Sequence, residues 1–149
     1  MLNLIKFIII CNALLLANQT NHLLLTKIVT QPTKAESFSI TNPTNSPIDL
    51  TNYYVSDSEE YYKIASYPDS TFSNKFNGFT VQFPSITINP YETLTIILDE
   101  DYKEFYGANH NPDLVMFGTS DSSMTGSVGL GDQGKIHQTK ELIILFYSD

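Results

Sequence analysis

Short runs in which apolar and polar side chains alternate are the feature that most limits how this chain can fold. Phe38 and Ile40 alternate with serine and threonine, and the same period of two recurs over 79–83 and 93–98. Successive side chains of a strand point to opposite faces, so this period predicts half-buried β-strands. Residues 142–147 are apolar at every position, which predicts a central, buried strand. From these runs we expect four core residues: Leu94, Ile96, Ile144 and Phe146.

Turn signals separate the runs. Asn-Pro pairs occur in the segments 42–47 and 89–92, and a glycine-rich segment spans 126–134. Proline next to asparagine favours a turn and disfavours a central strand. About seven or eight short strands with such punctuation predict an all-β sandwich.

One segment has a helical spacing instead. Tyr102, Phe105 and Tyr106 lie at positions i, i+3 and i+4, after a run of acidic residues and before Gly107. Acidic side chains favour the first turn of a helix, and glycine favours its end. The pattern therefore predicts one short helix near residues 100–106.

The first residues have the layout of a signal peptide. Lys6 precedes an apolar run over 7–17, and polar residues follow. The run is shorter than the about 20 apolar residues of a membrane-spanning helix. We expect a signal peptide over 1–17, a short segment over 18–22 and one secreted or cell-surface domain over 23–149. An uncleaved N-terminal anchor is the alternative, whereas the residues before Cys11 lack the small side chains of a lipid-attachment site.

Composition restricts the chemistry of the mature chain. Cleavage after residue 17 removes Cys11, the only cysteine, so no disulfide is expected. It also removes Lys6 and leaves 7 lysines against 16 acidic residues, a formal charge of 7 − 16 = −9. Arginine is absent. Because nucleic-acid binding needs a basic surface, we expect no nucleic-acid partner. We also expect no membrane span in the mature chain.

Four motifs, taken in order, resemble a known family. Residues 38–45 run from a strand into an Asn-Pro-Thr turn, and 48–57 continue with an apolar-Asp-Leu step, aromatic residues and Ser-Asp. The segment 86–94 resembles a hairpin around a Pro-x-Glu turn, and 129–131 with 141–145 resemble a closing part. Together they resemble the lamin tail domain of the exported bacterial type. The resemblance implies an immunoglobulin-like sandwich over 23–149 that serves attachment or recognition, with the buried aromatic of the family at Tyr53.

The chain departs from the family pattern at three places. Ser39 stands where many members carry a glutamate, so any role of that acid is lost. Tyr91 replaces the turn glycine, and because tyrosine does not readily adopt a positive φ we expect a type I turn there. Members usually continue with a glycine turn and a further strand, so the resemblance implies a domain truncated at Asp149.

Few residues suggest catalysis. His22, His110 and His137 show no metal-binding spacing, and we expect them at the surface. Residues 129–134 match G-x-G-x-x-G but do not join a strand to a helix, which favours a β-loop. No nucleophile motif is present, so we expect no enzymatic activity. No cofactor is expected. Calcium is the one ion for which the sequence offers candidate ligands, because acidic residues gather in two loops. The candidates are Asp57, Glu59, Asp99 and Asp101.

Tyrosines offer a different kind of surface, because an exposed tyrosine suits contact with carbohydrate or protein. The candidates are Tyr53, Tyr54, Tyr61, Tyr62 and Tyr67, of which Tyr53 is better placed in the core. The favoured hypothesis is an exported, non-catalytic interaction or structural module of the lamin-tail type that binds a protein or cell-surface ligand, or further domains of the same polypeptide. The alternative is the accessory N-terminal domain of a larger secreted hydrolase, a nuclease or phosphatase, whose catalytic part lies beyond Asp149.

Overall fold

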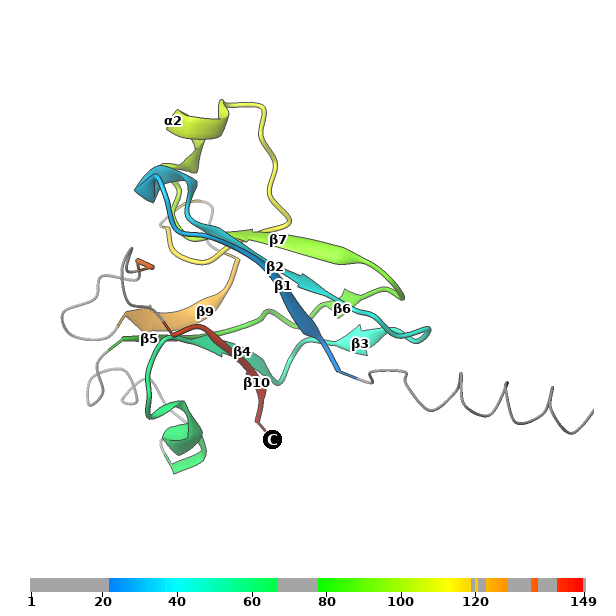
Figure 1. The fold of residues 1–149 in the computed structure, drawn as a ribbon. Coiled ribbons are helices and arrows are strands. Elements are labelled where there is room, and N and C mark those ends of the chain that lie inside the picture. The colour runs from blue at the N-terminus through cyan, green and yellow to red at the C-terminus, as the bar shows by residue number, and fades with distance from the viewer. Residues whose placement is uncertain are drawn as a thin grey trace, which may run out of the picture.

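The computed structural model describes residues 22–66, 78–118, 120, 123–128, 135–136 and 142–148 (Figure 1). Ten strands and three short helices lie in these ranges: β1 (Leu24–Val29), η1 (Thr33–Ala35), β2 (Ser37–Thr41), β3 (Ile48–Asp49), β4 (Tyr53–Ser56), η2 (Tyr61–Ser66), β5 (Phe79–Gln82), β6 (Thr87–Ile88), β7 (Thr93–Ile97), α2 (Tyr102–Tyr106), β8 (Leu114–Val115), β9 (Thr125–Val128) and β10 (Ile144–Tyr147). The prediction of an all-β sandwich with one short α-helix near residues 100–106 is confirmed.

Two four-stranded sheets make up the sandwich, with the orders β1-β2-β7-β8 and β10-β4-β5-β9. Neighbouring strands are antiparallel, except that β7 and β8 run parallel. The small pair of β3 and β6 forms a third sheet at one end (Figure 1). The inner faces of the two large sheets enclose the hydrophobic core.

The core forms where the alternating runs predict it. Phe38 and Ile40 of β2 are almost fully buried, and they pair with Ile96 and Leu94 of β7. The predicted core positions Leu94 and Ile96 are therefore confirmed. Phe79 and Val81 contribute from β5 in the opposite sheet. Burying each of these large side chains contributes about 1.5–3 kcal/mol, so the sandwich depends chiefly on these inner faces.

Asn42 directs the chain from the first sheet toward the second. Its side chain is completely buried, and its Nδ2 donates to the carbonyl oxygens of Ser46 (2.8 Å), Ile88 (3.2 Å) and Asn89 (3.1 Å). Its Oδ1 accepts the Thr44 backbone N–H at 2.9 Å and the Thr44 hydroxyl at 2.8 Å. One amide thus joins the turn after β2 to the turn before β7.

The turn at 89–92 corrects one expectation. Tyr91 has a φ of 60°, and the Glu92 N–H donates to the Asn89 carbonyl at 3.2 Å. A positive φ at the third position, after Pro90, belongs to a type II turn, so the predicted type I turn is wrong. The Glu92 carboxylate accepts the backbone N–H of Asn89 at 2.6 Å, which holds the turn despite the tyrosine.

The last strand corrects a second expectation. β10 pairs with β4 alone among the described residues and forms an edge of its sheet. Ile144 and Phe146 are half-buried rather than fully buried, so the prediction of a central strand with two core residues is wrong. An apolar side chain at every position arises here because one face packs on the core and the other carries an aromatic cluster. The period-two analysis cannot distinguish these two situations.

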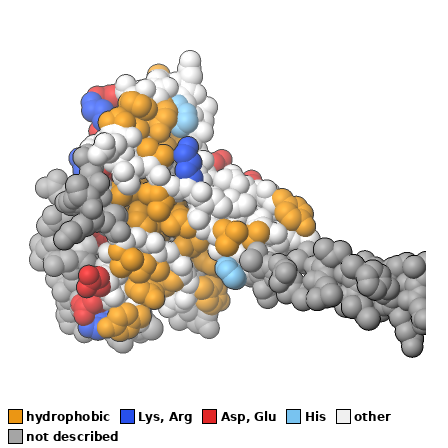
Figure 2. All heavy atoms as spheres, in the orientation of Figure 1, with side chains coloured by type: hydrophobic (Ala, Val, Ile, Leu, Met, Phe, Trp, Pro, Cys, Tyr) orange, Lys and Arg blue, Asp and Glu red, His pale blue; other side chains and the backbone are white. Residues whose placement is uncertain are grey.

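Backbone hydrogen bonds join the two large sheets on one side of the sandwich. The N–H groups of Ser123 and Met124, just before β9, donate to the Val115 carbonyl of β8 at 2.9 and 3.3 Å. The edges β8 and β9 therefore lie together, and β1 and β10 form the opposite side. Figure 2 shows apolar side chains gathered between the sheets on that side, where Leu25 and Leu145 are only partly buried against the core.

Helix α2 covers one end of the first sheet. Tyr102 is buried against Ile97 and Val115, and the Tyr106 hydroxyl donates to the Ala35 carbonyl at 3.1 Å. An ion pair between Lys34 and Glu104 adds a second link to η1. Neither α2 nor any other helix in the described part of the chain is long and apolar enough to cross a membrane.

We expect Asn42→Ala to destabilise the domain strongly. The substitution leaves carbonyl groups without their donor, one of them in a buried hydrogen bond, and removes the acceptor of the Thr44 N–H. The expected loss is about 3 kcal/mol or more in the free energy of unfolding, measured by denaturant melts. Asn45→Ala, in the exposed part of the same turn, is the matched control and should change stability by less than about 0.5 kcal/mol. Equal effects of the two substitutions would contradict the role given to Asn42.

Candidate functional site: the aromatic edge of the second sheet

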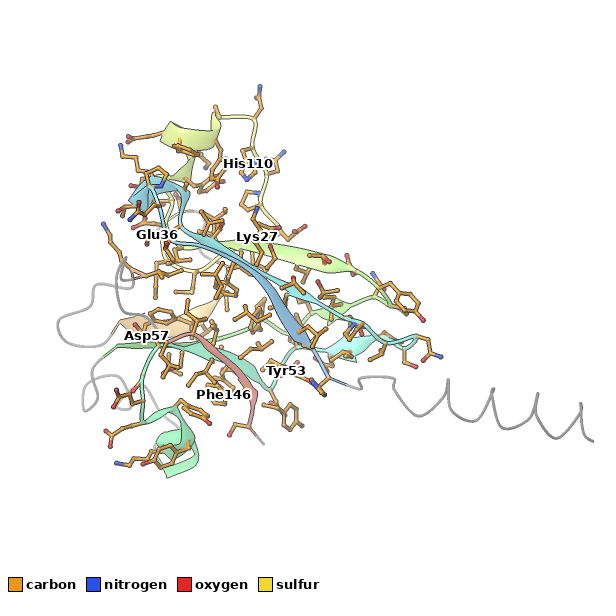
Figure 3. The ribbon with its side chains drawn as sticks, viewed as in Figure 1. Lys27, Glu36, Tyr53, Asp57, His110 and Phe146 are labelled. Carbon is orange, nitrogen blue, oxygen red and sulfur yellow. The ribbon has the colours of Figure 1, made fainter. Side chains whose placement is uncertain are left out.

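Aromatic side chains gather where β10 pairs with β4, at the edge of the second sheet (Figure 3). The antiparallel register places Phe146 opposite Tyr54 and Tyr147 opposite Tyr53. Helix η2, which follows β4, adds two more tyrosines. We call this group the aromatic edge: Tyr53, Tyr54, Tyr61, Tyr62, Phe146 and Tyr147.

The outer face of the sheet carries a continuous row of rings. Phe146 stacks on Tyr54 with ring centroids 5.4 Å apart and planes at 19°, and it contacts Tyr61 at 5.0 Å. Tyr61 in turn meets Tyr62 edge to face at 6.0 Å. Such pairs contribute about 0.5–1.5 kcal/mol each beyond the area they bury. The row therefore holds Tyr62, which is 65% exposed, on an ordered base.

The inner face carries one further pair. Tyr53 packs against the core, and its ring meets that of Tyr147 edge to face at 5.3 Å. Tyr147 itself is 57% exposed. Burial, and then the neighbouring Tyr147, raise the pKa of Tyr53 above its ordinary value of 10.0. Tyr53, which is predicted to belong to the core, is thus half-buried against it.

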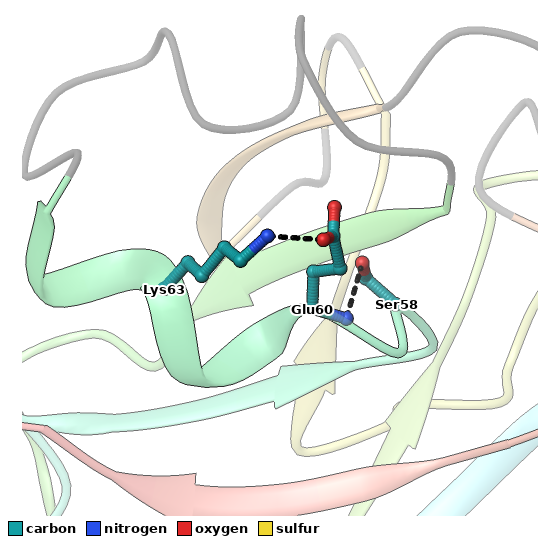
Figure 4. A network of polar contacts seen from close by, with 3 residues as sticks. All are labelled: Ser58, Glu60 and Lys63. Atoms are coloured by element: carbon teal, nitrogen blue, oxygen red, sulfur yellow. Dashed lines mark hydrogen bonds and ion pairs between the residues drawn. The ribbon is translucent and has the colours of Figure 1, made fainter.

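A compact polar turn positions η2 (Figure 4). Ser58 is buried, and its Oγ accepts the Glu60 backbone N–H at 3.2 Å. The Ser58 N–H donates to Ser56 Oγ at 3.0 Å, which ties the turn to the end of β4. Glu60 forms an ion pair with Lys63 one helical turn later. Serine is favoured just before a helix because its hydroxyl accepts a backbone N–H that the first helical turn leaves unpaired.

Acidic residues flank the aromatic edge at both ends of the β4–β10 pair. Asp57, Glu59 and Glu60 follow β4 at one end. Asp49 lies near the other end, where the Ser148 N–H donates to the Asn52 carbonyl at 3.0 Å. The Thr51 hydroxyl, and then its backbone N–H, lower the pKa of Asp49, so this carboxyl stays ionised at neutral pH.

The four calcium candidates serve other contacts or stand apart. Asp57 accepts the N–H of Phe79 and so fixes the start of β5, while Asp99 accepts the N–H of Glu100 at 2.7 Å. Glu59 is exposed, and Asp101 precedes α2 without capping it. Within the ranges described, no group of three or more His, Cys, Asp or Glu side chains could hold a metal ion.

Other carboxylates of the chain also accept backbone N–H groups. Asp113 accepts from Thr95 at 2.7 Å, and the buried Glu36 accepts from Ile136 at 3.1 Å. Charge-assisted hydrogen bonds of this kind are about twice as strong as neutral ones. Asp113 and Glu36 therefore each link two segments that lie far apart in the sequence.

The structure describes two of the three histidines, His22 and His110. His22 is exposed, as expected. His110 is half-buried, because the turn after α2 folds it onto Tyr106 with ring centroids 4.5 Å apart. Its Nε2 is buried without a hydrogen-bond partner, so the expectation of a surface residue is wrong for His110. Four expected features lie outside the described residues: the signal peptide 1–17, Tyr67, the loop 129–134 and His137.

Sequence analysis identified the tyrosines of β4 and η2 but missed Phe146 and Tyr147. The apolar run over 142–147 predicts a buried central strand, whereas β10 is an edge strand on which Phe146 is half-buried and Tyr147 is exposed. A signal was present: two adjacent aromatic residues in one strand must lie on opposite faces, as they also do in Tyr53–Tyr54. Two such strands, paired in register, produce aromatic rings on both faces of one edge.

Comparison of the chain with models of known protein families, with curated proteins and with solved structures found no match.

The raised pKa of Tyr53 predicts a pH dependence of stability. The folded protein keeps the Tyr53 proton at pH values where the unfolded chain releases it. The contribution of protonated Tyr53 to the stability of the fold is therefore complete below about pH 10, and it is lost as the pH rises through the folded-state pKa. We expect the Tm to fall more steeply above about pH 10 for the wild type than for Tyr53→Phe. Tyr62→Phe, which removes an exposed hydroxyl, is the control. Parallel curves for wild type and Tyr53→Phe would contradict the burial of Tyr53.

Proposed function

We propose that this chain is an exported, non-catalytic interaction module of the lamin-tail type, which recognises a protein or cell-surface ligand through the aromatic edge. The observation that carries the proposal is the row of stacked rings from Tyr54 through Phe146 and Tyr61 to the exposed Tyr62. The row runs from β4 across the edge strand β10 to η2, and charged residues flank it.

Exposed tyrosines on a rigid base are well suited to recognition. Tyr62 and Tyr147 are 65% and 57% exposed, yet each is held by contact with another ring. A tyrosine presents a large amphipathic surface and loses little conformational entropy when it binds. Residues of this type dominate the binding energy of many interfaces.

The chemistry of the described residues at the aromatic edge supports binding rather than turnover. The aromatic edge contains only tyrosine and phenylalanine side chains, and its neighbours Asp57 and Glu60 are engaged by the Phe79 N–H and Lys63. Catalysis of hydrolysis needs a nucleophile beside a base, or a metal, at hydrogen-bond distance. A ligand that binds here would meet rings and a polar rim.

The lamin-tail assignment and export rest on separate grounds. The order of motifs from residue 38 to residue 145 supports the family, and the buried Asn42 amide gives its Asn-Pro-Thr turn a structural reason. Two mainly antiparallel sheets around one core are compatible with an immunoglobulin-like arrangement. Lys6 and the apolar run over 7–17 support export by a signal peptide.

We expect Tyr62→Ala to reduce binding of the purified, labelled chain to the surface of the cells that produce it. Loss of a central aromatic contact costs about 2 kcal/mol in affinity, equivalent to roughly thirtyfold. Binding isotherms on intact cells would measure it. Tyr91→Ala is a matched control, because Tyr91 is also 65% exposed but lies in the turn between β6 and β7.

Two results would contradict the proposal. One is binding that Tyr62→Ala and Tyr91→Ala reduce equally, because the contact would then not involve the aromatic edge. The other is robust hydrolysis of phosphodiester, peptide or glycoside substrates by the purified chain, because a binding module without reactive groups should not turn them over.

A further inference from the structure

The free edge of β10 presents backbone groups with no partner in the described structure. In an antiparallel pair, the backbone groups of every second residue face the partner strand. The Ser148 N–H donates to the Asn52 carbonyl, so the N–H and C=O groups of residues 146 and 144 also face β4. The N–H and C=O groups of Leu145 and Tyr147 therefore point away from β4, along the edge of the sheet.

β10 lacks the features that usually protect such an edge. Natural edge strands carry a lysine, a proline or a bulge, or are very short. β1 has both a register shift after Leu25 and the charged Lys27, and β8 is two residues long. Residues 142–148 contain neither a charged residue nor a proline. Of the three edge strands β1, β8 and β10, β10 most resembles a template for pairing.

The side chains beside this edge define what could pair with it. On the inner face, Leu145 is partly buried against the core, and so is Leu25 of the edge strand β1 in the other sheet. On the outer face, Phe146 carries the stacked row of rings. A strand added to β10 would extend the sheet, and its inward side chains would meet the apolar surface shown in Figure 2. These side chains must be apolar, and every second one must point inward.

Acidic residues near both ends of the β4–β10 pair favour basic residues at the ends of an added strand. Asp57 and Glu59 lie beyond one end of the β4–β10 pair, and the ionised Asp49 lies near the other. The nearby Lys63 is engaged by Glu60. The whole chain carries a net charge of −8, so a second copy of it would meet like charges. A segment with basic residues at both ends is the complementary occupant.

We propose that β10 is a strand-addition site for an extended segment of a partner protein, with alternating apolar side chains and lysine or arginine at both ends. The segment pairs with the outward N–H and C=O groups of Leu145 and Tyr147. Main-chain hydrogen bonds provide affinity, and the alternating side chains provide selectivity. This inference rests on the proposed function, because it specifies the class of ligand and the mode of binding at the aromatic edge.

The test uses the purified full chain and the fluorescently labelled synthetic peptide KKVTVTVKK, with EEVTVTVEE as the charge control. We expect the basic peptide to bind at least about tenfold more tightly at low salt, with the difference shrinking as salt rises. Tyr147→Pro replaces the outward N–H by a ring that blocks the edge and breaks no bond to β4. Tyr147→Thr removes the same aromatic ring but keeps the N–H. We expect binding by Tyr147→Pro to be at least about tenfold weaker than by Tyr147→Thr.

A second measurement does not depend on the folding of any variant. One peptide is N-methylated at its threonines and another at its valines, because the N–H groups of alternate residues point to opposite edges of a strand. Strand addition predicts that one methylation pattern reduces binding at least about tenfold and that the other is tolerated.

Four results would overturn the proposal. They are no binding of KKVTVTVKK, equal binding to Tyr147→Pro and Tyr147→Thr, equal binding of both methylated peptides, and a dimer of the chain that the peptide does not compete with. The proposed function is tested separately. If Tyr62→Ala still reduces cell-surface binding in that case, the module stands and strand addition alone is wrong.

Discussion

The buried amide of Asn42 is the interaction on which the path of the chain depends. It links the turn after β2 to the carbonyl groups of Ile88 and Asn89, where the chain enters β7. From that turn the chain passes through β3 to β4, and the buried Leu50 is held by the Ile86 carbonyl at 2.9 Å. The position of β4, and hence of β10 beside it, follows from this crossover. The polar side chain of Asn42 can be fully buried because both its Nδ2 and its Oδ1 have hydrogen-bond partners.

The two sides of the sandwich differ, and the difference gives the domain its candidate contact surface. Hydrogen bonds to Val115 join the sheets on the β8–β9 side. On the β1–β10 side, partly buried apolar residues and the aromatic edge face outward. Phe146 contacts the half-buried Tyr54 and Tyr61, and Tyr61 in turn supports the exposed Tyr62. In the proposed function, stability and recognition therefore depend on the same aromatic residues, and a substitution at Phe146 is expected to affect both.

The sequence predicts the inner faces well and the edges poorly. Phe38, Leu94 and Ile96 follow the period of two, which depends only on the local geometry of a strand. The short helix is equally local, since its acidic start and its glycine end lie within 99–107. Strand order is set by pairing between segments that lie far apart in the sequence. The local pattern of residues 142–147 therefore does not predict that β10 lies at the edge of its sheet. Tyr91 accepts a positive φ because Glu92 and Asn89 hold the turn, and residue type alone predicts otherwise.

Within the described part of the chain, the backbone N–H and C=O groups of Leu145 and Tyr147 have no partner, whereas those of Phe146 between them face β4. Amide hydrogen exchange, followed residue by residue by NMR, tests this arrangement directly. The Phe146 amide should exchange at least about tenfold more slowly than those of Leu145 and Tyr147 in the chain alone. Equal protection of all three amides would contradict the open edge, and the strand-addition site would then have no basis.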